Sequence, residues 1–171
     1  EWLERILPNV VRLVEKDPYR SVFTRFVTPH SADEAPGNWR NFYKNWPQVT
    51  RAVAPRDQFE LVQPLPQYIP PAASFEKYTN SAFSSPELIA HFHSKNVDTL
   101  IISGAETDVC VAASVFSAVD HGYRVVIAAD AVCSSSDEGN DYIKKILGGR
   151  FSSSIDVADT DEILDVWVTG G

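Results

Sequence analysis

Hydrophobic residues in the second half of the chain form short continuous runs separated by segments with helical spacing. The continuous runs predict buried strands at residues 99–103, 124–129 and 154–158. The segments with helical spacing predict helices at residues 108–121, 137–147 and 160–167. Strands that alternate with amphipathic helices are typical of βαβ units. We therefore expect an α/β protein, with a three-layer α/β/α fold and a mostly parallel sheet.

Several helix ends carry recognisable signals. Asp137 and Thr160 are residue types preferred at helix N-caps, and Gly148 suits the C′ position that follows a helix. Earlier in the chain, Ser85 followed by Pro86 predicts another helix start, with serine as the N-cap and proline at the first helical position.

The first half of the chain is less regular. Residues 1–16 have helical spacing, and Pro8 predicts that the regular part begins only there. Residues 21–28 and 59–65 are predicted strands. Four aromatic residues between them follow the spacing of a short amphipathic helix: Trp39, Phe42, Tyr43 and Trp46. These four residues line a substrate pocket or, in the plainer interpretation, pack on the core or on another subunit.

Composition and charge narrow the class of protein. The 171 residues, 44% hydrophobic and 22% charged, suit one globular domain over residues 1–171. A net charge of −8 argues against nucleic-acid binding, and no apolar run reaches the roughly 18 residues of a membrane span. Two cysteines cannot form a disulfide framework, so we expect a reducing, cytoplasmic location. We also expect a small-molecule substrate and a homo-oligomer.

Cys110 is the strongest candidate for chemistry. The buried run 99–103 ends at Gly104, a tight turn follows, and Cys110 falls in the first turn of the next predicted helix. Ligands bind beyond the carboxyl ends of parallel strands, and the positive end of a helix favours the nucleophilic thiolate. The plainer interpretation is a small buried residue, since free cysteine is often buried. Cys133 is followed by three serines and has no implied charge partner.

Lys77 and Asp130 have two interpretations each. Lys77 lies among aromatic residues in the segment FEKYTNSAF, where it stabilises a thiolate or an oxyanion or is a solvated surface residue. Asp130 follows a predicted strand and either reaches the site or forms a local cap or turn. The four histidines are more typical of surface residues than of ligands. The sequence has no nucleotide-binding glycine motif and no G-x-S-x-G elbow.

The segments GAETDVCVAA and SAVDHGYRVVIAADAV resemble the isochorismatase-like cysteine hydrolase superfamily, and FEKYTNSAF resembles its lysine segment. The resemblance is strongest over residues 85–168 and implies a three-layer α/β hydrolase of amides, ureido compounds or, in the namesake, a vinyl ether. It implies that Cys110 is the nucleophile and Lys77 the charged member of an Asp–Lys–Cys triad. It also implies a cis peptide bond between Ala105 and Glu106, which directs the N–H groups of Glu106 and Cys110 into an oxyanion hole.

Two departures from the superfamily pattern affect these expectations. The triad aspartate of the superfamily lies in a D-x-Q segment on a strand before the helix that corresponds to residues 1–16, and this sequence contains no such segment. We therefore expect an N-terminally incomplete domain, with an unfilled slot between the strands at 21–28 and 99–103. Metal-binding, nicotinamidase-type members carry Asp-x-His after the second strand, where residues 24–30 offer only His30. We expect no catalytic metal and no cofactor, and we disfavour a nicotinamidase.

The resulting hypothesis is a metal-independent cysteine hydrolase that cleaves an amide or ureido C–N bond through a thioester. Two alternatives stay open: a non-catalytic relative that binds a ligand or partner, and a vinyl-ether hydrolase of the isochorismatase type. Retention of Cys110 together with Lys77 argues against the first, and a thiol at position 110 argues against the second.

Overall fold

The structure is a computed structural model that describes residues 2–168. Its α-helices are α1 (Trp2–Lys16), α2 (Trp39–Asn45), α3 (Pro86–Ser94), α4 (Ala112–Asp120), α5 (Asp137–Arg150) and α6 (Thr160–Val166). Its strands are β1 (Val22–Phe26), β2 (Ala73–Lys77), β3 (Thr99–Ala105), β4 (Arg124–Cys133) and β5 (Ile155–Ala158). No helix in the described range has the length and apolar character needed to cross a membrane.

The strands form two parallel sheets instead of one. β1 pairs with β2, and β3, β4 and β5 lie in that order in the second sheet. Within residues 2–168 no ladder joins β1 to β3, so these two strands do not pair directly. The α/β/α architecture is confirmed, but the parallel sheet is divided in two.

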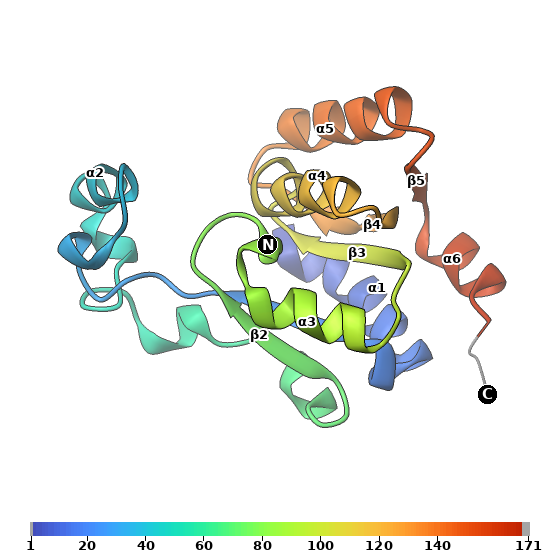
Figure 1. The fold of residues 1–171 in the computed structure, drawn as a ribbon, viewed down its shortest axis with the longest axis horizontal. Coiled ribbons are helices and arrows are strands. Elements are labelled where there is room, and N and C mark those ends of the chain that lie inside the picture. The colour runs from blue at the N-terminus through green and yellow to red at the C-terminus, as the bar shows by residue number, and fades with distance from the viewer. Residues whose placement is uncertain (1, 169–171) are drawn as a thin grey trace.

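Two apolar clusters cover opposite faces of the sheets. Residues of α3, α4 and α5 pack with Val125 and Ile127 of β4, whereas residues of α1 and α6 pack with Ala128 of the same strand. Side chains alternate between the two faces of a strand, so β4 contributes to both clusters. β1 does the same, with Val22 against the first cluster and Phe23 in the second. The helices thus hold both sheets in one body, while α2 lies apart from the strands (Figure 1).

The predicted strands differ most from the structure at β4, at residues 59–65 and at β2, and β3 ends at Ala105, two residues later than predicted. β4 continues to Cys133, so Asp130 and Cys133 lie inside this strand and not beyond its end. The strand predicted at residues 59–65 is wrong: the segment consists of bends, turns and the ends of 3-10 helices. Pro64 has no N–H to donate to a ladder, which disfavours a strand there. β2 was not predicted, because polar side chains such as Glu76 interrupt its apolar pattern.

Helix α5 begins and ends differently from the prediction. Its N-cap is Ser136, whose Oγ accepts a hydrogen bond from the Gly139 N–H at 3.2 Å, and Asp137 is the first helical residue. The helix also continues through Gly148 instead of ending before it. A Cβ at this glycine would lie 2.9 Å from the Val157 Cγ2, so the missing side chain lets α5 pack closely on β5.

Helices α1 and α6 also differ at their first turns. α1 already starts at Trp2 and continues through Pro8, and residue 1 of the predicted helix lies outside the described residues. The N-cap of α6 is Asp159 and not Thr160, and the Asp159 N–H donates to Glu162 at 2.9 Å.

Asp130 of β4 joins the sheet to the helices on one face. Its carboxylate accepts hydrogen bonds from the Asn9 side chain of α1 at 2.8 Å and from the Thr160 N–H and hydroxyl of α6 at 2.8 and 2.7 Å. Hydrogen bonds to a charged group are stronger than those between neutral groups. Asp130 is therefore a structural anchor, and the interpretation that it reaches the site is wrong.

Asp130→Asn should lower the free energy of unfolding by about 2 kcal/mol, because an amide replaces a charged acceptor of three hydrogen bonds. Urea denaturation measures the change. The matched control is Asp156→Asn on β5, which removes an exposed ion pair with Arg124 and should cost less than about 1 kcal/mol. Equal losses in the two variants would contradict the anchor role.

Candidate active site

The carboxyl ends of β2 and β3 bring Lys77 and Cys110 together. Lys77 is the last residue of β2, and Cys110 lies in a π-helical turn (Thr107–Val111) between β3 and α4. The Lys77 Nζ lies 3.2 Å from the Cys110 Sγ, although 33 positions separate the residues. This edge of an open α/β sheet is where ligands bind. The expected proximity of the two side chains is therefore present.

The Lys77 ammonium is buried, and all of its donors are used. Only 5% of the residue is exposed. Nζ donates to the backbone carbonyls of Thr79 at 3.0 Å and Asn80 at 2.7 Å and to the sulfur of Cys110. An ammonium has three donors and no acceptor, so it cannot take a proton from the thiol. Lys77 therefore acts on the sulfur as a fixed positive charge.

The Lys77 ammonium has an aromatic ring on one side, and no carboxylate of the described residues forms an ion pair with it. The Phe26 ring lies below the ammonium, with 4.7 Å between Nζ and the ring centroid. Within residues 2–168, no acidic side chain forms an ion pair with Lys77, and nearby Glu76 pairs with Arg25 instead. Coulomb interactions are stronger where water is excluded. Negative charge that develops near Cys110 is thus met by a cation that no described carboxylate neutralises.

Hydrogen bonds fix the backbone of the turn that carries Cys110. The Ser114 Oγ donates to the Cys110 carbonyl at 2.7 Å and accepts the Ala82 N–H at 3.0 Å. Ser114 thereby ties the turn to the segment that follows Thr79 and Asn80. The peptide bond between Ala105 and Glu106, just before the turn, is cis.

Asp108 fixes the same turn to β4 and α5. The Ser134 Oγ donates to the Asp108 carboxylate at 2.6 Å and accepts the Asp108 N–H at 3.2 Å. A Cβ on Gly139 of α5 would lie 2.5 Å from the other carboxylate oxygen, so this glycine leaves space for Asp108. The N-cap of the turn is Glu106, and Asp108 lies inside the turn.

Cys133, the second thiol, is in a different environment. It is 8% exposed and lies at the end of β4. Burial, followed by the nearby carboxylate of Glu106, raises the pKa of the Cys133 thiol. A raised pKa keeps this sulfur protonated and less nucleophilic than an ordinary cysteine.

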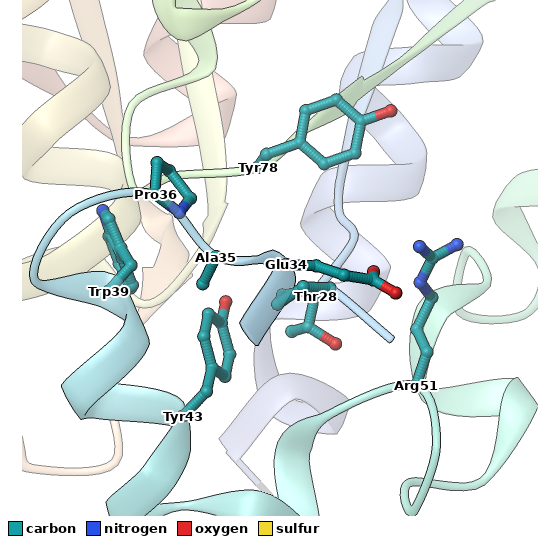
Figure 2. A pocket seen from close by; sticks show the side chains of 9 residues that line it. Thr28, Glu34, Ala35, Pro36, Trp39, Tyr43, Arg51 and Tyr78 are labelled. Carbon is teal, nitrogen blue, oxygen red and sulfur yellow. The ribbon is translucent and has the colours of Figure 1, made fainter. Parts of the chain in front are cut away.

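The four aromatic residues of the predicted pocket helix do not act as one group. Trp39 and Tyr43 line a cavity of ≈ 260 Å³ with Thr28, Ala35 and Tyr78. Phe42 and Trp46 do not line this cavity and are 40% and 53% exposed. Figure 2 shows the Trp39 and Tyr43 side chains reaching the cavity from α2.

Histidines and acidic residues form no metal-binding arrangement in the described part of the chain. No group of three or more His, Cys, Asp or Glu side chains lies close enough there to hold an ion. His91 and His121 instead contact the rings of Phe75 and Phe83. No reaction step is therefore assigned to a metal held by residues 2–168.

Some positioning groups have no sequence signal. Every residue has a carbonyl oxygen, so nothing marks those of Thr79 and Asn80 as partners of Lys77. Ser114 follows Cys110 by four positions, a spacing at which a serine can bond back to a helical carbonyl. That spacing was the one available signal, whereas the pairing of Ser134 with Asp108 depends on how β4 lies beside the turn.

Comparison with known proteins gives one family. A family model described as the isochorismatase domain matches residues 1–159. A maleamate amidohydrolase from Pseudomonas putida is 30% identical over 114 residues, which cover 63% of this chain and 48% of that protein. An uncharacterised isochorismatase family protein from Bacillus subtilis is 28% identical over 97 residues, which cover 55% of this chain and 53% of that protein. The chain spans about half the length of the curated relatives it matches.

Solved structures of similar proteins share the fold. A nicotinamidase from Bacillus subtilis superposes with a TM-score of 0.74 at 22% identity, over 93% of this chain and 87% of that chain. An N-carbamoylsarcosine amidase from Thermoplasma acidophilum gives a TM-score of 0.70 at 17% identity, over 98% of this chain and 87% of that chain. At these identities the likeness concerns the fold.

Iodoacetamide should label Cys110 and spare Cys133 in the folded protein. The Cys110 sulfur lies beside the Lys77 ammonium, whereas the Cys133 thiol is buried and has a raised pKa. Peptide mapping after mild treatment at neutral pH measures the ratio, with Cys110→Ser and Cys133→Ser as matched controls. Faster labelling of Cys133 would overturn the assignment of Cys110 as the reactive thiol.

Proposed function

Because the chain belongs to the isochorismatase domain family, we propose that it hydrolyses an amide or ureido C–N bond of a small molecule, with Cys110 as the nucleophile. The observation that carries the proposal is the buried Lys77 ammonium, 3.2 Å from the Cys110 sulfur. The relatives named as a maleamate amidohydrolase and an N-carbamoylsarcosine amidase support this bond class. Cytoplasmic location and a homo-oligomeric state are part of the same proposal.

The proposed reaction is acyl transfer to sulfur followed by hydrolysis. The thiol proton of Cys110 passes to a carboxylate as the sulfur attacks the carbonyl carbon. The carbonyl electron pair moves to oxygen, where the N–H groups of Glu106 and Cys110 stabilise the negative charge. The C–N bond then breaks, and the leaving amine takes the proton from the carboxylic acid. Water attacks the thioester in turn, which releases the acid and restores the thiol.

The carboxylate of this reaction is proposed to come from outside the described residues. Lys77 has no acceptor, and Asp130 is occupied by α1 and α6. Among the described residues, β1 and β3 each have a strand partner on one edge only. An extended segment between them would pair with both free edges and would end near Lys77 and Cys110. We propose that such a strand, ending in an aspartate, supplies the proton acceptor.

A non-catalytic, ligand-binding relative is the second candidate. It is favoured by one observation, the lack of an acidic partner for Lys77 within residues 2–168. Ammonia release from a panel of small amides and ureido compounds separates the two candidates. Release by the full-length protein would support the hydrolase, and binding without release would support the second candidate.

Lys77→Met should lower kcat for the best amide by about 10²-fold or more, because removal of a group that stabilises transition-state charge has effects of this size. Cys110→Ala should abolish thioester formation. The matched control is Lys95→Met, which removes an exposed lysine at the end of α3. Circular dichroism checks that each variant folds, and Lys77→Arg, which keeps the charge, provides a second variant. An unchanged kcat in a folded Lys77→Met protein would exclude the electrostatic role.

A protein limited to residues 1–171 should be slower than the full-length gene product by about 10²–10⁴-fold, the usual contribution of a positioned general base. Turnover of one amide by the two proteins measures the difference. Equal rates would contradict a proton acceptor outside these residues, and they would direct the search to a carboxylate within them.

A further inference from the structure

We infer that the cavity beside α2 binds the acyl part of the substrate and selects uncharged groups that carry a hydrogen-bond acceptor. The inference rests on the proposed function for its link to Cys110. Substrates of this class are small amides whose acyl group contains an ether or carbonyl oxygen or a ring nitrogen. The Tyr43 hydroxyl is the group that recognises the acceptor.

The cavity has the size and lining of a site for a small molecule. Its volume of ≈ 260 Å³ is just below the roughly 300–1,000 Å³ of most ligand pockets, so it suits a compact ligand. Trp39, Tyr43, Ala35 and Pro36 give it an aromatic and apolar wall. Such pockets use a few placed polar groups to orient the ligand.

The Tyr43 hydroxyl is the unpaired polar group of this wall. Tyr43 is only 1% exposed, and its hydroxyl has no hydrogen-bond partner among the described residues. Figure 2 shows the hydroxyl pointing into the ring of residues that line the cavity, toward Ala35. A buried hydroxyl without a partner has an unfavourable desolvation free energy. A ligand that accepts its hydrogen bond removes this penalty and therefore binds more tightly. Burial also raises the pKa of Tyr43, which keeps the proton on the oxygen as a donor.

The charges around the cavity favour a neutral ligand group. Glu34 and Arg51 both line it, and Figure 2 shows them together on the side away from Trp39. One carboxylate oxygen of Glu34 accepts a hydrogen bond from the backbone N–H of His30 at 3.0 Å, which holds the acidic group in place. An anionic ligand would be attracted by the Arg51 guanidinium and repelled by the Glu34 carboxylate. The Tyr43 side offers a single neutral donor, so an uncharged acceptor fits it best.

The cavity lies near Lys77, with the Phe26 ring between the Trp39 wall and the Lys77 ammonium. Tyr78, which lines the cavity, directly follows Lys77 in the chain. The Phe26 ring lies 4.7 Å from the Lys77 Nζ, and its centroid is 6.4 Å from that of Trp39. One aromatic ring therefore separates the wall of the cavity from the buried cation. A ligand in the cavity is on the same edge of the sheets as Cys110.

The decisive experiment compares two amides that differ by one atom. Cyclohexanecarboxamide and tetrahydropyran-4-carboxamide have nearly the same shape, but only the second has a ring acceptor. Full-length Cys110→Ala protein, which cannot turn over the ligand, should bind the ether amide about tenfold more tightly in an NMR titration, the ratio expected for pairing a buried donor. In Cys110→Ala/Tyr43→Phe protein, the two amides should bind equally.

A stability measurement separates recognition from a structural role of Tyr43. Tyr43→Phe removes a hydroxyl that lacks a partner and keeps the ring, so its urea midpoint should be unchanged or higher. A lower midpoint would mean that the hydroxyl serves the folded protein itself, and this would overturn the inference.

Other outcomes also give a clear answer. Equal binding of the two amides by the Cys110→Ala protein, which retains the Tyr43 hydroxyl, would overturn the inference. A preference for the ether amide that survives in the Cys110→Ala/Tyr43→Phe protein would overturn it as well. Tightest binding of the anionic amide succinamate, lost in Arg51→Gln, would make the cavity a carboxylate site and also overturn it.

The proposed function fails separately: an acceptor preference with no hydrolysis of any amide by the full-length protein contradicts only the hydrolase. Hydrolysis without any acceptor preference contradicts only the cavity assignment.

Discussion

The packing of helices across two unpaired sheets is the constraint on which the site depends. Ile6, Val10 and Leu13 of α1 share one apolar cluster with Phe23 of β1 and Ala128 of β4, so side chains of this helix and of both sheets belong to the same cluster. Each such buried side chain contributes about 1.5–3 kcal/mol. Lys77 belongs to the first sheet and Cys110 follows a strand of the second. Without the shared helix layers, no backbone ladder of the described residues would hold the cation against the sulfur.

The parts of the fold that could be predicted are those with a local signal. β3 and β4 contain continuous apolar runs at residues 100–102 and 125–129, and β4 continues past the predicted end. The start of α3 is determined by two neighbouring residues, and Ser85 accepts the Leu88 N–H as the cap motif predicts. The location of Cys110 just after β3 follows from the end of an apolar run before Gly104, which is also local information, although β3 itself continues to Ala105.

The parts that could not be predicted depend on contacts between distant segments. Polar residues obscure β2, which is a strand because it pairs with β1 over five positions. Gly148 has the sequence appearance of a helix end, but its role is to admit Val157 of β5. The partners of Lys77 are carbonyl oxygens, and the division of the aromatic helix into buried Tyr43 and exposed Trp46 follows from how α2 packs. The resemblance to a known family could identify Cys110 and Lys77 as the reactive pair. It could not identify the groups that position their side chains.

The three glycines of α5 bear differently on how this sequence can drift over evolutionary time. Glycine lowers the stability of a helix by up to about 1 kcal/mol relative to alanine, so replacement of a helical glycine by alanine is favoured where space allows it. Gly149 has open space where a Cβ would be and can accept alanine with a gain. A Cβ at Gly139 would lie 2.5 Å from the Asp108 carboxylate, and one at Gly148 would lie 2.9 Å from the Val157 Cγ2, so a side chain at either position would force its neighbour to move. Homologues that keep the hydrogen bonds between Asp108 and Ser134 and the close packing of α5 on β5 are therefore expected to vary freely at position 149 and to retain glycine at 139 and 148.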